Sequence, residues 1–255
     1  LTKRLVYRVF NDVEMTRGGR FYGGFWTQIP QEARQRIVVD GKRMVELDYS
    51  GLHPTILYNE KGLDAPPDPY TAILDKLDLK DQPITLPNEP DRKFTRRDSM
   101  KVAFNTMINA SKHMKRPPNG MHLGLVGKTW KQVEAAVIEI FQPIAEHFYN
   151  DTGARLQRID SDIAQEVLLH FAQHPDGRVP CLPVHDSFLI HHGYEQELKD
   201  IMDKMYERKL GFPIKIKAKY AEHEYQQGWL NMSISSLLEY DMRDYEQRLQ
   251  AFKQR

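Results

Sequence analysis

The alternation of apolar and polar residues over 36–50, RIVVDGKRMVELDYS, is typical of a β-hairpin. The pair Asp40-Gly41 is a strong two-residue turn signal between two runs of β-branched and apolar residues. Because successive side chains of a strand point to opposite faces, Asp48 lies on the opposite face from its apolar neighbours. Ser50 favours a helix start as a side-chain cap, so the sequence predicts a carboxylate at a strand-to-helix junction.

A second strand pair is predicted over 181–192, CLPVHDSFLIHH, with its turn at His185-Asp186, and a basic strand follows at 213–222. Apolar residues with a helical period predict helices over 70–78, 96–111, 129–150, 156–174, 194–209 and 235–255. Pro143 is expected to kink the third of these. The Pro- and Asp-rich stretch 64–92 indicates an insertion or linker. Strands and helices are mixed without a regular β-α-β alternation, which favours an α+β fold.

Composition argues against a polycationic, a disulfide-bonded and a membrane-spanning protein. In 255 residues, 36 basic side chains against 35 acidic ones leave a formal net charge of +1, so the whole molecule is not a polycation. Basic residues cluster locally at 92–97 and 112–116, either as polyanion-binding patches or as ordinary solvated surface. The single cysteine, Cys181, excludes an intrachain disulfide and fits the cytoplasm or another reducing intracellular compartment. No apolar run is long enough to span a bilayer, so we expect no membrane partner.

Two carboxylates, Asp48 and Asp186, lie at the ends of predicted strands although they are far apart in the sequence. Hard oxygen ligands held by rigid strands select Mg²⁺ or Mn²⁺. If the two strands are neighbours, the side chains can share two ions about 3.5–4 Å apart, with the backbone carbonyl of Tyr49 as a further ligand. Such a pair of ions activates an attacking oxygen and stabilises a leaving phosphate oxygen. The alternative is that both aspartates are ordinary surface residues in turns.

The predicted helix over 96–111 carries a polar residue at every fourth position, along one slowly drifting face. These residues are Arg97, Lys101, Asn105 and Asn109. The guanidinium of Arg97 and the ammonium of Lys101 would together clamp a triphosphate. Phe104 and Ile108 lie beside this face and are candidates to pack a base. The alternative is a solvent-exposed stripe on an amphipathic helix.

Three stretches occur in the order and character of motifs A, B and C of polymerase palms and fingers: LDYSGLH (47–53), RRDSMKVAFNTMINAS (96–111) and PVHDSFLI (183–190). TRGGRFYGGFWTQIP (16–30) is similar to the Arg-Gly-Arg segment that precedes motif A, and QRIDSDI (157–163) is similar to the Asp-Ser helix of mitochondrial and phage RNA polymerases. The chain therefore resembles the superfamily of family A DNA polymerases and phage-type single-subunit RNA polymerases. Each match is short, so their order and spacing carry the resemblance.

The resemblance implies a role for each matched residue. Asp48, Asp186 and the backbone carbonyl of Tyr49 would bind two Mg²⁺ ions, with Mn²⁺ as a substitute. Lys101 would complete the catalytic set by donating a proton to the leaving pyrophosphate. The nucleotide site would comprise Tyr49, His53, Arg97, Lys101, Asn105 and Asn109. The primer–template would be contacted by Arg17, Arg20, Tyr22, Asp160, Ser161 and His185.

Two departures from the family pattern bear on templating and sugar choice. Asn109 stands where both families carry an aromatic residue that stacks near the template base. His53 stands where the DNA enzymes have Glu and the RNA enzymes have Gly, so the choice of sugar stays open. The tripeptides HDS at 185–187 and IDS at 159–161 lean towards ribonucleotides.

The resemblance also implies an architecture in which an antiparallel sheet packs on helices. Residues 1–60 would form the first part of a palm, 61–155 a mainly helical fingers-like insertion, and 156–255 the second part of the palm with a C-terminal helix. Little chain precedes Arg20, and the chain begins at Leu1. We therefore expect upstream domains or a protein partner to supply a thumb or processivity.

The expected function is that of a nucleotidyltransferase of replication or transcription, with a phage or mobile-element origin among the options. It would add nucleotides from NTPs or dNTPs to a 3′-hydroxyl of a primer–template by two-metal-ion catalysis, as a primase-like or RNA-polymerase-like core. Two alternatives stay open. A two-metal nuclease needs the two aspartates but not the phosphate clamp, and a catalytically inactive polymerase-like module would only bind nucleic acid.

Overall fold

The computed structural model describes residues 3–34, 36–86, 94–177, 179–219, 247, 249–252 and 254. Its internal contacts divide the chain into two compact units. The sheet unit comprises Leu1–Val9, Gly19–Ser50 and Asp160–Arg255, and the helical unit comprises Phe10–Gly18 and Gly51–Ile159. The boundaries expected from the sequence are 60/61 and 155/156, whereas the helical unit runs from Gly51 to Ile159 and also takes in Phe10–Gly18.

A five-stranded antiparallel sheet forms the core of the sheet unit. Its order is β3 (Val38–Val39), β4 (Lys42–Tyr49), β6 (Ser187–His191) and β5 (Cys181–Val184), and β7 (Ile216–Lys219) pairs with the other edge of β4. A separate two-stranded sheet consists of β1 (Tyr7–Phe10) and β2 (Gly18–Tyr22). This arrangement, together with the helices, confirms the predicted α+β class.

The turns of the main sheet follow the local sequence. Asp40 (φ 51°) and Gly41 (φ 71°) adopt the left-handed conformation that a tight two-residue turn between β3 and β4 requires. His185 (φ 56°) lies in the turn between β5 and β6, where Val184 pairs with Ser187. Both predicted strand pairs are therefore confirmed, with their turns at the expected residues.

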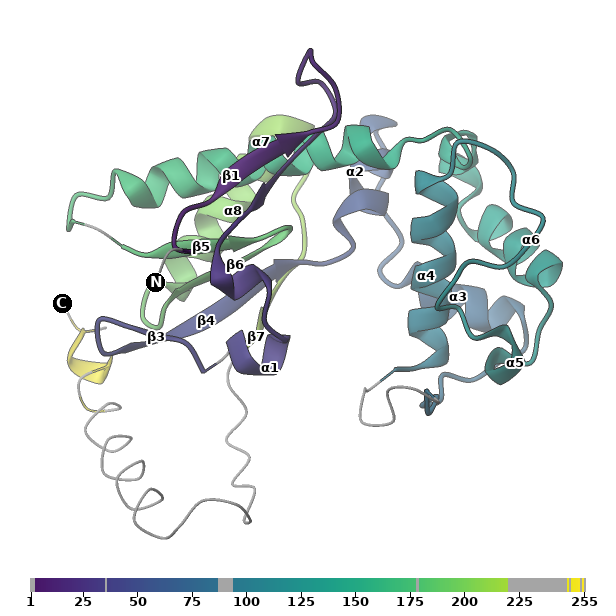
Figure 1. Cartoon of the computed structure of the whole chain (residues 1–255), viewed down its shortest axis with the longest axis horizontal. Helices are drawn as coiled ribbons and strands as arrows, with labels where there is room; N and C mark the ends of the chain where they lie inside the picture. Colours follow the sequence, from purple (N-terminus) through teal and green to yellow (C-terminus); the bar gives the residue numbers. More distant parts are fainter. Residues whose placement is uncertain are drawn as a thin grey trace, which may run out of the picture. The chain divides into compact units, whose positions relative to one another are not determined.

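Both faces of β4 are covered. Tyr49 and its alternate neighbours face helix α8 (Glu195–Leu210), and the Tyr49 hydroxyl donates to the Met202 carbonyl at 2.7 Å. Figure 1 shows α8 lying behind the strands β4, β5 and β6. The other face carries a cluster next to the short 3-10 helix η1 (Phe25–Thr27), made of Trp26, Met44, Val184 and Leu189. Asp48 shares this second face, so its carboxylate lies on the side of the sheet away from α8.

The helical unit is built on an aromatic core. Its elements are α2 (Leu52–Glu60), α3 (Pro69–Lys76), α4 (Arg96–Asn109), α5 (Leu123–Val126), α6 (Trp130–Ile140), η2 (Gln142–His147) and the first part of α7 (Gly153–Ala172). The rings of Phe104 and Phe141 lie 4.5 Å apart between centroids, and Phe148 packs edge-on against Phe104. Contacts among α3, α4 and α6 enclose this core. The sheet unit further contains α1 (Gln31–Arg34).

Two helix boundaries differ from the prediction. Gly51, with a φ of 63°, caps α2, and the hydroxyl of Ser50 makes no hydrogen bond within the described residues. The prediction of Ser50 as the cap is therefore wrong. The helix expected over 129–150 stops as an α-helix at Ile140 and continues as η2, because Pro143 has no backbone N–H to donate to the preceding turn.

Two further expectations from the sequence concern the C-terminal helix and membrane-spanning helices. The polar helix predicted over 235–255 falls mostly outside the described residues; of those described, 247 and 249–252 are helical. Within those that are described, no helix combines the length and apolar character needed to cross a bilayer.

Candidate active site

Asp48 and Asp186 come from neighbouring strands of the main sheet. Asp48 pairs with Ser187 in the antiparallel register of β4 and β6. The backbone N–H of Tyr49 donates to the carbonyl oxygen of Asp186 at 3.2 Å. Asp186 therefore lies in the β5–β6 turn directly beside the end of β4, and the two remote aspartates are brought together by backbone pairing.

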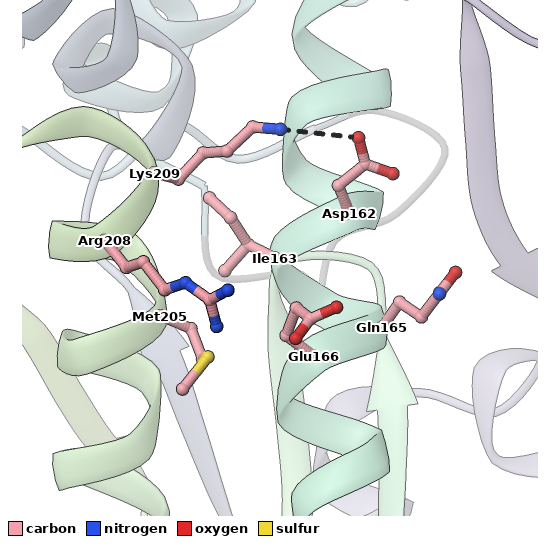
Figure 2. Close-up of a pocket in the computed structure, with 7 residues that line it drawn as sticks. All are labelled: Asp162, Ile163, Gln165, Glu166, Met205, Arg208 and Lys209. Carbon is pink, nitrogen blue, oxygen red and sulfur yellow. Dashed lines mark ion pairs between the residues drawn. The ribbon is translucent and has the colours of Figure 1, made fainter.

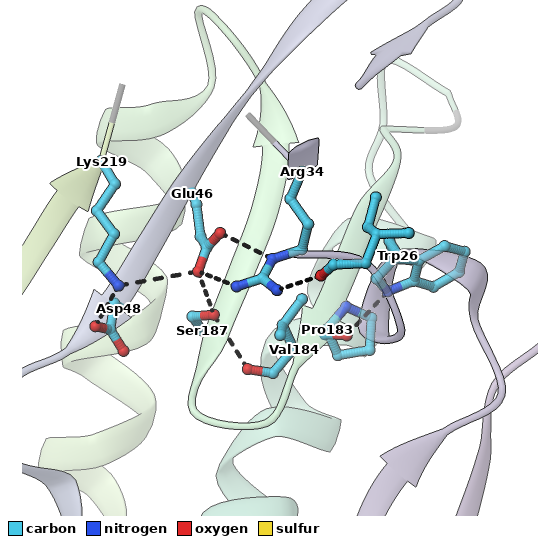
Figure 3. A network of polar contacts seen from close by, with 9 residues as sticks. Trp26, Arg34, Glu46, Asp48, Pro183, Val184, Ser187 and Lys219 are labelled. Carbon is cyan, nitrogen blue, oxygen red and sulfur yellow. Dashed lines mark hydrogen bonds and ion pairs between the residues drawn. The ribbon is translucent and has the colours of Figure 1, made fainter. Parts of the chain in front are cut away.

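A third carboxylate, Glu46, lies two residues before Asp48 on the same face of β4 (Figure 3). Glu46 is 2% exposed and accepts two hydrogen bonds from Arg34, at 3.1 Å from Nε and 3.3 Å from Nη2. The hydroxyl of Ser187 donates to Glu46 Oε1 at 3.0 Å. These bonds satisfy a charge that would otherwise be costly to bury.

We expect Ser187→Ala to lower the free energy of unfolding by about 1.5 kcal/mol, because it removes a hydrogen bond to the charged Glu46. Urea unfolding followed by circular dichroism measures the change. Ser50→Ala is the matched control in the same unit, since the buried Ser50 hydroxyl makes no hydrogen bond with any described residue. The control should change stability by less than about 0.5 kcal/mol. Equal losses in the two variants would contradict a stabilising role for the bond to Glu46.

A lysine from the far edge of β4 joins this group of acids. Lys219 Nζ lies 2.8 Å from Asp48 Oδ2 and 3.9 Å from Glu46 Oε1. Figure 3 shows the ammonium group between the two carboxylates. The register of β7 against β4 sets Lys219 opposite Glu46, so its side chain reaches Asp48 diagonally.

Asp160 is a buried carboxyl on α7, 2% exposed, that accepts a hydrogen bond from Arg20 Nε at 2.8 Å. Burial raises the pKa of Asp160 to about 7; the nearby Asp186 adds to the rise, and Arg20 opposes it. The neighbouring Ser161 is also buried, and its hydroxyl accepts from Arg8 Nη2 at 2.6 Å. Both predicted nucleic-acid contacts on α7 are thus held by arginines from the N-terminal segment.

His185 and Tyr22 form a ring pair next to Asp186, with centroids 5.8 Å apart in an edge-to-face arrangement. Burial lowers the pKa of His185, with a further contribution from Arg20 against the opposing charge of Asp186. The imidazole is therefore neutral at pH 7. Its Nδ1 is buried and makes no hydrogen bond within the described part of the chain, while Tyr22 is 37% exposed. The pair thus combines an unsatisfied polar atom with an accessible ring.

The helical unit carries the predicted phosphate-binding residues. Arg97 is held by Asp68, with Nε at 3.1 and 3.0 Å from the two carboxylate oxygens, and its guanidinium lies over the Tyr70 ring. The hydrogen bond to Asp68 raises the pKa of Arg97. Lys101, Asn105 and Asn109 form an exposed row along α4. Phe104 and Ile108 are fully buried, so the expectation that they pack a base is wrong.

The remaining predicted residues are placed as follows. Arg17 Nη2 donates to the backbone carbonyl of Asp151 at 3.0 Å and also to its carboxylate. His53 lies in the first turn of α2. Tyr49 is 2% exposed and its hydroxyl donates to Met202, so its side chain is not available to a nucleotide.

Sequence reasoning missed Glu46, Arg34 and Lys219. Glu46 and Asp48 are two residues apart in a predicted strand and therefore share one face, so the sequence alone could have identified Glu46. Arg34 and Lys219 belong to segments that reach the site only through the fold, and nothing in their local sequence marks them.

The oxygen donors present at the site suit Mg²⁺. The carboxylates of Asp48 and Asp186 and the carbonyl of Tyr49 are hard ligands, and Asp48 already holds a cation in the form of Lys219. Mg²⁺ commonly binds one or two carboxylates together with substrate phosphates and water. A two-aspartate site is therefore consistent with the finding that no described group of three or more His, Cys, Asp or Glu side chains is suited to a metal.

A separate hollow of about 280 Å³ lies between α7 and α8 of the sheet unit (Figure 2). Its lining is made of Asp162, Ile163, Gln165, Glu166, Met205, Arg208 and Lys209. Acidic side chains from α7 face basic ones from α8, and Lys209 pairs with Asp162 at 3.7 Å. The hollow therefore carries balanced charge and does not select an ion of either sign.

No protein-family model matches the chain, and no curated protein matches its sequence. Among solved structures, the chain is similar to the POL domain of Pol1 from M. smegmatis, which was solved in complex with a DNA primer-template and dNTP. The TM-score is 0.46 and the sequence identity is 13%. The alignment covers 75% of this chain and 42% of that chain, so the present chain spans less than half of the length of the structure that it is similar to.

Proposed function

We propose that the chain is a nucleotidyltransferase that extends a nucleic-acid strand. In the proposed reaction, the 3′-hydroxyl of a primer attacks the α-phosphorus of a nucleoside triphosphate, and pyrophosphate leaves. The observation that carries the proposal is the position of Asp48 beside Asp186, at the ends of paired strands. Two carboxylates fixed in this way suit two divalent cations, which would activate the attacking oxygen and stabilise the leaving one.

The rigidity of β4 supports the proposal. Over 46–49 the strand is hydrogen-bonded on both edges, and both of its faces are covered. Charge stabilisation of a transition state depends on groups that do not have to reorganise during the reaction. A carboxylate on such a strand meets this requirement better than one on a mobile loop.

On α4 we assign phosphate binding to Lys101 and Arg97. Lys101 is exposed and would hold the triphosphate and donate a proton to the leaving pyrophosphate. Arg97 would exchange its present partner, Asp68, for a phosphate, since its fork geometry suits either anion. Asp68 would thus orient the guanidinium until a nucleotide arrives.

For the primer–template we assign Arg20, His185 and Tyr22. Asp160 fixes the guanidinium of Arg20, a group whose planar fork of donors suits a base edge or sugar. The exposed ring of Tyr22 provides a stacking surface, and His185 supports that ring by packing edge-to-face against it.

Primer extension tests the proposed function. The full chain is incubated with 5′-labelled DNA or RNA primers on DNA or RNA templates, with Mg²⁺ and either dNTPs or NTPs. We expect the labelled strand to lengthen with at least one combination of primer, template and sugar. That combination also decides the sugar choice that His53 leaves open.

Two results would overturn the proposal. Shortening of the labelled strand would support a two-metal nuclease instead. Binding of the primer–template in fluorescence anisotropy without any change in its length, under all eight combinations and with Mn²⁺ as well, would support an inactive binding module.

A further inference from the structure

Lys219 is the cation that lies nearest to Asp48 in the described part of the chain. Its Nζ is 2.8 Å from Asp48 Oδ2 and 3.9 Å from Glu46 Oε1. The side chain is 30% exposed, so the ammonium group is partly shielded from water. The hydrogen bond is charge-assisted and short, which is the stronger class of such bonds.

Lys219 lies much closer to Asp48 than to Glu46. Glu46 receives two hydrogen bonds from Arg34 and one from Ser187, and its contact with Lys219 is the longest of these. Asp48 receives its short contact from Lys219. The charge of Lys219 is therefore directed mainly at Asp48, while Arg34 balances Glu46.

We propose that Lys219 is a built-in counter-ion of Asp48 that a divalent cation must displace, so that Lys219 sets the metal affinity of the site. The inference rests on the proposed function in taking Asp48 as a metal ligand. Lys219 is a positioning residue here, because it acts through Asp48 and is assigned no contact with substrate.

The reason is competition for one oxygen. A cation bound to Asp48 Oδ2 would lie close to the ammonium of Lys219, and two positive charges at that separation repel. Lys219 therefore has to turn away before the carboxylate is available. In the ion-free protein the same contact relieves the repulsion between Asp48 and Glu46, which lie on one strand face.

Metal affinity tests the proposal without any catalytic turnover. The full chain is titrated with Mn²⁺, and free Mn²⁺ is measured by its electron paramagnetic resonance signal. Lys219→Met keeps the apolar stem and removes the charge. We expect it to bind Mn²⁺ about fivefold more tightly than wild type, which corresponds to about 1 kcal/mol.

Lys217→Met is the matched control. Lys217 is on the same strand, lies directly opposite Asp48 in the register, and is exposed, with no ion pair to another described residue. Removing it changes the net charge by the same amount, yet affinity should change by less than about twofold. An equal gain in both lysine variants would mean that only overall charge matters, and would overturn the proposal.

Asp48→Asn separates the failure of this inference from that of the proposed function. If wild type shows no Mn²⁺ binding that Asp48→Asn removes, the metal site itself is wrong and both proposals fall. If wild type binds Mn²⁺ through Asp48 but Lys219→Met binds it equally or more weakly, only the inference about Lys219 fails.

A second readout uses ion-free protein and does not depend on metal binding. Lys219→Met and the milder Lys219→Gln should each lower the melting temperature in EDTA, and they should do so less in an Asp48→Asn background. Added Mn²⁺ should raise the melting temperature more in the variants than in wild type. Purely additive effects of the two substitutions would show that Lys219 does not act on Asp48.

Discussion

Asp186→Asn is expected to lower the rate of primer extension at least about 10³-fold. Asparagine keeps the size of the side chain but loses the negative charge that would hold a divalent cation in the β5–β6 turn. A loss of about 4 kcal/mol of transition-state stabilisation corresponds to this factor. Asp48→Asn is expected to have the same effect, because the two carboxylates would share the ions. Single-turnover extension of a labelled primer measures both rates.

Asp75→Asn is the matched control for these two variants. Asp75 is an exposed aspartate on α3 with no assigned role, so the substitution removes the same charge elsewhere in the chain. It should extend the primer at the wild-type rate. A rate within about tenfold of wild type for Asp186→Asn would contradict the assignment of the site.

The second large effect concerns the pH dependence of stability and comes from Asp160. The ordinary pKa of this carboxyl is 3.8, and the fold raises it to about 7, chiefly by burial. Between these values the folded protein keeps a proton that the unfolded chain has released. Stability therefore falls as pH rises from about 4 to about 7. Below and above that window this group causes no further change of stability with pH.

The magnitude follows from the difference between the two pKa values. At 1.36 kcal/mol for each unit, the loss attributable to Asp160 over this window is about 4 kcal/mol. Asp160→Asn removes the titration and keeps an oxygen that can accept from Arg20. Urea unfolding in metal-free buffer at several pH values should show a flatter profile for this variant than for wild type.

Asp200→Asn is the control for the pH experiment. Asp200 is exposed on α8 in the same unit, so its removal should leave the wild-type slope in place. If Asp160→Asn and wild type lose stability in parallel from pH 4 to 7, the carboxyl of Asp160 does not titrate in this window.

The sequence predicts most elements of this fold because their signals are local. The turn at Asp40-Gly41 has residues that tolerate positive φ, and the strand pair around His185-Asp186 shows the expected apolar runs. The start of α2 is an exception. Ser50 has the chemistry of a cap, but Gly51 takes the left-handed conformation at that position, and the helix begins after it.

For the site, the sequence predicts the meeting of Asp48 and Asp186 but not the charges around them. Periodicity places Phe104 next to the polar row of α4. Whether its ring is exposed to a ligand or buried in the core depends on how α3 and α6 pack against α4, and the structure shows it buried. Arg34 and Lys219 reach the carboxylates from α1 and β7 through tertiary contacts. Such contacts leave no periodic or motif signal in the chain itself.

The central claim is that two aspartates, remote in sequence, bind the same divalent cations. The most direct measurement is a crystal structure of the chain with Mn²⁺, in which the anomalous signal locates the ions. We predict an ion with oxygen ligands from both Asp48 and Asp186 at about 2.0–2.2 Å. A Mn²⁺-saturated crystal whose anomalous peaks all lie away from these two carboxylates would contradict it.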